Sequence, residues 1–276
     1  MTPELPVSPA LPGEPSVLDV GMARVWLAKR NVFVSLPTRL LSHRIAARED
    51  LRRRDLNRRM IITFVVIFAA VFGTGVLFEI VLAGRPGYSV NRSALYALVV
   101  GSYQLVMWRI VRRRDRLAQG LVPQGPKPLP TARLKLLGGW YLAGLTSTFV
   151  GGAALGVALA VGGSPSLYGW SWLAVLGIGA VPVGVILKDV LTGPAIAEDT
   201  ASLAVDNALR IQDAYFATPP IYAILLVIEP YFSGRHMAFF TPWLIAYAVL
   251  ALGTHLIGEL RRWRHRSLPP GYYGRE

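Results

Sequence analysis

The chain alternates between long apolar blocks and short polar segments. A helix rises about 1.5 Å per residue, so roughly 20 apolar residues cross the hydrocarbon core of a bilayer, which is about 30 Å thick. Six blocks fit this length, the shortest of them least well: residues 60–83, 94–111, 138–162, 168–191, 219–232 and 239–258. The pattern predicts an all-α protein, a polytopic transmembrane helical bundle with six spans between residues 60 and 258.

The segments at the two ends of the chain have their own patterns. Residues 1–16 carry a proline at every third position from 3 to 15, which favours a disordered tail over a polyproline II ligand. Residues 17–59 combine apolar and basic positions at helical spacing and predict cytoplasmic amphipathic helices, interrupted at Pro37. Residues 259–276 predict a basic cytoplasmic tail.

Between the fourth and fifth blocks, residues 198–217 predict an acidic amphipathic helix, because small residues recur there at steps of three and four. Asp199 or Thr200 can serve as its N-cap, and Arg210 follows Asp206 at the spacing of a helical ion pair. Three carboxylates one heptad apart are expected to share one face of this helix while the alanines pack inward: Asp199, Asp206 and Asp213.

An acidic face is repelled by an anionic membrane surface, so the helix needs another surface to receive it. The first candidate is internal, the arginines of residues 44–59 or 109–116. The second is a basic cytoplasmic partner protein. A shared metal ion is excluded, because carboxylates one heptad apart lie about 10 Å apart along a helix axis.

The third and fourth blocks carry small residues that bear on helix packing. A repeat of four residues in the third block predicts a close helix–helix contact: Gly144, Thr148, Gly152, Gly156 and Ala160. The fourth block contains Pro182 among several glycines, which predicts a kink or a break near the middle of the membrane.

Charge orients the predicted spans. The chain has a net charge of +13, and 26 of its 29 Lys and Arg residues fall in segments on one side of the six blocks. Basic residues mark the cytoplasmic side, so both termini are expected in the cytoplasm of a cell whose plasma membrane carries anionic inner-leaflet lipids. These lipids account for the basic composition, and no nucleic-acid partner is expected.

The residues needed for catalysis are missing or misplaced. The chain has no cysteine, no phosphate-binding glycine loop and no charged residue at the midplane, where the polar residues are Gln104 and Thr146–Thr148. The stretch "GTHLIGEL" around His255 resembles the last catalytic span of rhomboid proteases, but the fourth block, "LGIGAVPVG", lacks their serine. We therefore expect no enzyme activity, cofactor or metal, and His255 and Glu259 can bond to each other.

Two functions remain. One is a transport-associated, permease-like subunit whose cytoplasmic helices couple to a separate ATPase; the other is a scaffold or regulator that docks a partner through the acidic helix. A homo-oligomer is a further possible partnership. The stretch "AEDTASLAVDNALR" at 197–210 resembles one in uncharacterised multi-pass proteins of actinobacteria. That resemblance implies a bacterial plasma-membrane location and carries no activity.

Overall fold

The computed structural model describes residues 14–49, 54–81, 92–120, 130–162, 166–232, 239–264 and 267–275. The proline-rich tail predicted for residues 1–16 lies almost entirely outside them. The described chain is nearly all helical, with two short paired strands. The elements are α1 (Val17–Ala28), β1 (Leu36–Pro37), α2 (Arg39–Glu49), α3 (Arg54–Val81), α4 (Arg92–Gln119), α5 (Pro130–Leu137), α6 (Gly139–Thr146), the π-helical turn η2 (Ser147–Gly151), α7 (Gly152–Gly162), α8 (Ser166–Thr192), α9 (Thr200–Phe216), α10 (Pro220–Phe232), α11 (Thr241–Arg264) and β2 (Gly274–Arg275).

Five helical stretches among the described residues are long and apolar enough to cross a membrane: Ser93–Arg113, Gly139–Gly162, Tyr168–Thr192, Thr200–Ile228 and Thr241–Arg262. They indicate a multi-pass membrane protein, as the apolar blocks predicted. One stretch differs from its block: Thr200–Ile228 takes in the helix predicted to be cytoplasmic, whereas the pattern placed a span only over residues 219–232. In α3 the apolar part within the described residues, Ile61–Thr74, is shorter. The first predicted span, and with it the count of six, therefore remains a prediction.

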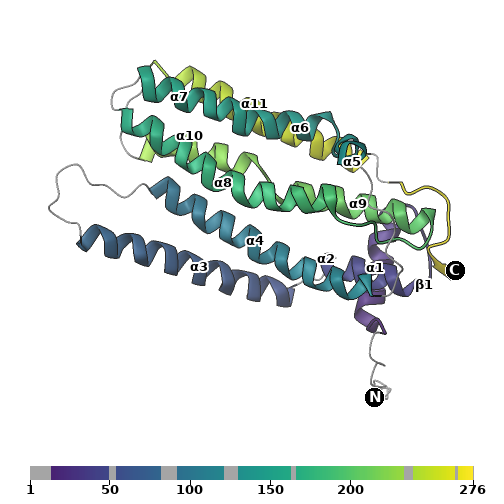
Figure 1. Ribbon diagram of the computed structural model, residues 1–276. Helices are drawn as coiled ribbons and strands as arrows, with labels where there is room; N and C mark the ends of the chain where they lie inside the picture. The colour runs from purple at the N-terminus through teal and green to yellow at the C-terminus, as the bar shows by residue number, and fades with distance from the viewer. Residues whose placement is uncertain are drawn as a thin grey trace.

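The long helices run side by side in layers (Figure 1). The α6–η2–α7 helix and α11 form one layer, α8 and α10 the next, and α4 and α3 follow. Helix α3 packs on α4 through aromatic contacts such as Phe64–Tyr103, with ring centroids 5.7 Å apart. Many of its other apolar side chains, Val65 and Val66 among them, are exposed, as expected for a lipid-facing surface.

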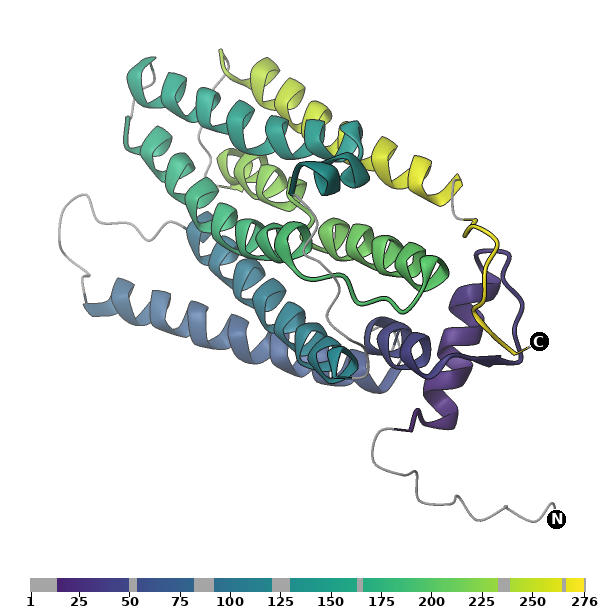
Figure 2. The ribbon, with the colours of Figure 1, turned by 45° about the vertical axis from the view of Figure 1, so that its right-hand side comes forward.

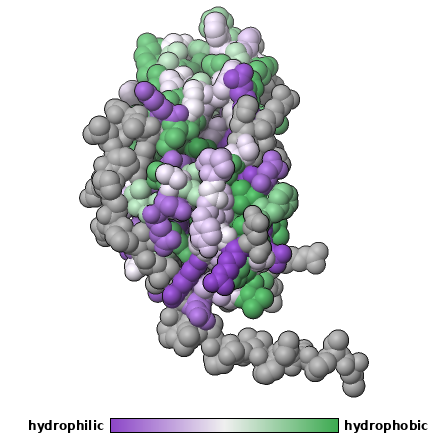
Figure 3. Space-filling view, turned by 90° about the vertical axis from the view of Figure 1, so that its right-hand side faces the viewer, coloured by the Kyte–Doolittle hydropathy of each residue, from purple (hydrophilic) through white to green (hydrophobic). Residues whose placement is uncertain are grey.

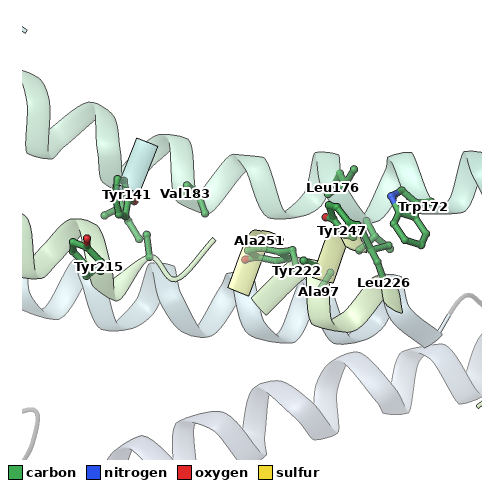
Figure 4. Close-up of a cluster of buried hydrophobic side chains, with 14 of the residues drawn as sticks. Ala97, Tyr141, Trp172, Leu176, Val183, Tyr215, Tyr222, Leu226, Tyr247 and Ala251 are labelled. Carbon is green, nitrogen blue, oxygen red and sulfur yellow. The ribbon is translucent and has the colours of Figure 1, made fainter. Parts of the chain in front are cut away.

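Buried aromatic side chains hold the layers together (Figure 4). Several of them keep the polar tip bonded inside the bundle, where water cannot satisfy it. The Tyr141 hydroxyl donates to the Ala214 carbonyl at 3.0 Å, and the Tyr247 hydroxyl to the Thr148 carbonyl at 2.9 Å. The Trp172 indole donates to the Gly152 carbonyl at 2.9 Å. The core is therefore fixed by directional bonds as well as by apolar contact.

The small residues of the third span lie against two neighbouring helices. Gly144 faces α11 at Thr254 and His255, and Gly156 faces α8 at Trp172 and Leu173. An added Cβ at Gly156 would lie 2.8 Å from Trp172 Cδ1, closer than real Cβ atoms come. The same stripe continues through the buried Thr148, through Gly152 against Tyr247, and to Ala160, whose backbone nitrogen would lie 2.2 Å from a Cβ at Gly169.

The fourth predicted span is not broken. Helix α8 continues through Pro182, whose ring lies against Gly101 of α4. A break does occur between α9 and α10, where Thr218 takes a positive φ of 40°. Pro219 and Pro220 cause it, because a residue before proline is disfavoured in the helical region, and Pro220 then starts α10.

The break frees a backbone carbonyl in the interior. The Ile221 amide bonds to Thr218 at 3.1 Å, so the Ala217 carbonyl loses the partner an unbroken helix would supply. Gln104 of α4 donates to it at 2.7 Å and accepts the Tyr222 hydroxyl at 2.8 Å. Gln104, an amide side chain in the middle of the apolar part of α4, thus satisfies the break.

Helices α1, α2 and α9 and the C-terminal segment gather at one end of the bundle (Figures 1 and 2). A capping box formed by Ser16 and Asp19 starts α1. The predicted C-terminal tail does not extend freely: β2 pairs with β1, and Tyr273 is buried among the apolar residues of α1, α2 and α9. We call this assembly of residues 14–49, 200–216 and 267–275 the end domain. Figure 3 views this end and shows hydrophilic side chains spread among apolar ones.

Candidate functional site

The three predicted carboxylates of α9 have three different environments. Asp199 is exposed and caps the helix: its side chain accepts from the Ser202 amide at 2.7 Å. Asp206 is fully buried, and Asp213 is mostly buried. On the small-residue face Ala201 is buried, and Ala204 and Ala208 are half-buried. Both faces of α9 are therefore covered in part, and arginines cover the acidic one at Asp206 and Asp213.

Asp206 is held by two arginines. Arg44 of α2 places Nη2 2.7 Å from its Oδ1, and Arg210 places Nε 2.8 Å from its Oδ2. The second contact is the i,i+4 pair expected from the sequence. The side chains of Arg44 and Asp206 are only 2% and 1% exposed. Arg44 also donates to the Ile196 carbonyl at 2.9 Å, which ties α2 to the segment that precedes α9.

Arg48, one turn after Arg44, bridges two carboxylates from different helices. It donates to both oxygens of Asp115 of α4 at 2.9 and 2.8 Å. It also donates to both oxygens of Asp213 at 2.9 and 2.7 Å. Two-pronged contacts of this kind are the strongest that a guanidinium makes. Arg48 therefore joins α2 to α4 and α9.

A further pair links α8. Arg112 of α4 is bonded to Asp189 of α8 and lies 4.0 Å from Asp115. Arg210 donates to the Val190 carbonyl at 3.0 Å at the end of the same helix. Within the described residues the whole cluster holds four arginines and four aspartates, so its formal charges cancel: Arg44, Arg48, Arg112, Arg210, Asp115, Asp189, Asp206 and Asp213. We call this set the ion network.

The ion network shifts the pKa values of two of its members. Burial alone would raise the pKa of Asp115, but the charge and hydrogen bonds of Arg48, together with Arg44 and Arg112, lower it below its ordinary value. Burial alone would lower the pKa of Arg48, but Asp213 and Asp115 raise it well above its ordinary value. Both groups are therefore charged throughout the physiological pH range.

Acid should weaken the ion network. The pKa of Asp115 is lower in the folded protein than in the unfolded chain, so the unfolded state binds more protons in acid. The contribution of Asp115 to the free energy of unfolding is fully present above the ordinary aspartate pKa of about 3.9. It is lost as the pH falls through the lower pKa of the folded state. We expect the melting temperature in detergent to fall from pH 5 to pH 2.5. The Asp115→Asn variant should show a shallower fall; an equal slope in both proteins would contradict this assignment.

A cavity of about 270 Å³ lies beside the network. Met107, Trp108 and Val111 of α4 form one wall, and α11 contributes Glu259 and Arg262. The end of α9 and the tip of α2 complete the lining with Arg48, Gln212, Asp213, Tyr215 and Phe216. The break between α9 and α10 follows directly after Phe216. The sequence pattern did not predict this cavity, whose walls come from four separate segments.

His255 does not form the arrangement expected from sequence. The Glu259 carboxylate pairs with Arg262, whose Nη2 lies 3.0 and 2.8 Å from its two oxygens. The His255 ring instead packs between Tyr141 and Tyr215, at centroid distances of 6.4 and 5.3 Å. In the part of the chain that the structure describes, no group of three or more His, Cys, Asp or Glu side chains is placed to hold a metal ion.

Comparison with known proteins gives no family for this arrangement: no family model, no curated protein and no solved structure matches the chain.

Proposed function

We propose that the chain is a non-enzymatic, transport-associated subunit of the plasma membrane, permease-like, whose end domain couples to an ATP-hydrolysing partner. The observation that carries this proposal is the ion network. It ties α2 and α9 of the end domain to α4 and α8 at the ends of two candidate spans. A force applied to the end domain would therefore reach the spans through buried, directional contacts instead of through a flexible loop.

The broken α9–α10 stretch supports the same proposal. Discontinuous helices line substrate paths in many transporters, because their ends expose backbone groups inside the bundle. Here the end of α9 lines the cavity, and the break is bonded to α4 through Gln104. A movement of the end domain would act directly on this point.

The alternative is a scaffold that docks a basic partner through the carboxylates of α9. Asp206 and Asp213 are already bonded to the protein's own arginines. A partner would have to displace buried ion pairs to reach them. Asp199 alone offers an exposed carboxylate from the predicted set. We therefore prefer the coupling role for the end domain.

The coupling role can be tested by placing a photo-crosslinking amino acid at Val25, which is exposed on α1. We expect light-dependent capture of an ATP-hydrolysing protein in native membranes, because the exposed face of the end domain would be its docking surface. Val157, equally exposed but within a candidate span, is the matched control and should capture lipid only. Lipid capture at both positions, with no ATPase, would contradict the proposal.

The proposal also requires both termini and α9 to be cytoplasmic. Single cysteines can be introduced into a chain that contains none. Positions 88 and 234, which lie outside the described residues, should react with a membrane-impermeant reagent added outside the cell. Position 125, also outside them, and Leu203 on α9 should react only after permeabilisation. External labelling at position 203 would place α9 on the wrong side for coupling.

A further inference from the structure

The cavity beside the ion network lies at the level where two candidate spans end. Met107 and Val111 belong to the last turns of the Ser93–Arg113 stretch, and Glu259 and Arg262 to the last turn of Thr241–Arg262. In a membrane, both ends lie at the boundary between hydrocarbon and water. This is the depth of lipid head groups, and a ligand that enters from the bilayer would present its polar end here.

The charges that line the cavity cancel. Arg48 faces Asp213, and Arg262 faces Glu259. A ligand with a single charge, of either sign, would meet an equal number of like and opposite charges. A head group with one negative and one positive end can instead meet each with its complement. The lining therefore selects for a zwitterion.

One donor in the lining is unused. Arg262 Nε is buried and has no hydrogen-bond partner among the described residues, although Nη2 of the same guanidinium bonds to Glu259. The guanidinium lies 4.8 Å from the centroid of the Tyr215 ring, which holds its plane in place. A phosphate oxygen is an acceptor that suits this donor, since hydrogen bonds from a guanidinium to phosphate are charge-assisted and strong.

The rest of the cavity suits an ammonium group joined to apolar chains. The carboxylates of Asp213 and Glu259 can accept hydrogen bonds from a primary ammonium, which a trimethylammonium cannot donate. Trp108 and Phe216 add aromatic surface, which attracts cations and also packs against acyl chains. At about 270 Å³ the cavity is below the size typical of sites that enclose a whole drug-sized ligand, so it fits a head group whose chains stay in the bilayer.

We propose that this cavity binds the head group of a zwitterionic phospholipid with a primary ammonium, the phosphatidylethanolamine class. Arg262 holds the phosphate, and Glu259 and Asp213 hold the ammonium. The inference rests on the membrane location of the chain and not on the transport role proposed above.

Native mass spectrometry of the detergent-solubilised full chain can test this with three lipids of equal acyl composition: phosphatidylethanolamine, phosphatidylcholine and phosphatidylglycerol. We expect the first to bind most tightly. Arg262→Gln and Glu259→Gln should each lower the affinity for phosphatidylethanolamine roughly tenfold, the effect of one lost charged hydrogen bond. Arg109→Gln, which changes an exposed arginine of α4 outside the cavity, should leave it unchanged.

Val111→Phe provides an independent variant, because it fills the cavity from the α4 wall and leaves all four charged groups in place. It should also weaken binding. Equal affinity for the ethanolamine and choline lipids, or a preference for phosphatidylglycerol, would overturn the proposal. So would tight binding of soluble glycerophosphoethanolamine at the affinity of the lipid, since the ligand would then be a water-soluble zwitterion and not a membrane lipid.

Discussion

Replacing Asp115 with asparagine should destabilise the protein by about 3–5 kcal/mol, the range observed when one member of a buried ion pair is removed. Asp115 receives two hydrogen bonds from Arg48 and lies within 4.0 Å of Arg44 and Arg112. The substitution keeps the side-chain size and leaves buried guanidinium charge without compensation. Chemical unfolding in detergent, followed by circular dichroism, measures the change.

The matched control is Glu198→Gln, which removes an exposed carboxylate one residue before the N-cap of α9. Exposed charges contribute about 0–1 kcal/mol, so this variant should unfold nearly like the parent. A double-mutant cycle with Arg48→Met should show strong coupling, because each change removes the partner of the other. If Asp115→Asn and Glu198→Gln cost the same, the ion network does not stabilise the fold.

The second large effect is expected at the stripe of small residues in the third span. Gly156→Leu and Gly152→Leu should each cost on the order of a few kcal/mol, because the added side chains overpack a closed interface. At Gly152 even a Cβ would lie 2.6 Å from the Tyr247 hydroxyl, so leucine would force that hydroxyl away from the Thr148 carbonyl. Melting temperature in detergent is the measurement.

Gly177→Leu is the control for both variants, since nothing lies within 4 Å of a Cβ built there and the residue is exposed on α8. It introduces the same side chain into a candidate span without a neighbour to displace. We expect it to melt within a few degrees of the parent. Equal losses at Gly156 and Gly177 would mean that leucine is tolerated poorly for reasons other than packing.

The helices were predictable because the bilayer imposes one requirement on every span: backbone groups must be bonded within the helix. Apolar length therefore predicted four of the five candidate spans closely, and the cap expected at Asp199 placed the start of α9. The stripe from Gly144 to Ala160 was also visible in the sequence, because a period of four residues marks one helix face. Its neighbours, α11 at one end and α8 at the other, were not visible, since they depend on how the helices pack.

The same limit applies to the ion network. The heptad spacing of Asp199, Asp206 and Asp213 indicated a shared face, but the face could not be assigned to solvent or interior without its partners. Arg44 and Arg48 lie far away in sequence, and Asp115 stood out only as one acid within a basic segment. The sequence also could not show that α8 stays unbroken at Pro182. Pro182 is accommodated in α8 beside Gly101, which makes room for its ring.

The long sequence separation within the ion network has a consequence for biosynthesis. Arg48 lies 67 residues before Asp115 and 165 residues before Asp213. At about 5–20 residues per second, the ribosome reaches Asp213 roughly 8–33 seconds after Arg48. Asp115 is available to the two arginines first, and the carboxylates of α9 arrive only after α3, α4 and α8 have been synthesised. Arg44 and Arg48 therefore lack their α9 carboxylates while the first spans are synthesised. The end domain cannot complete its ion pairs until most of the membrane helices have been made.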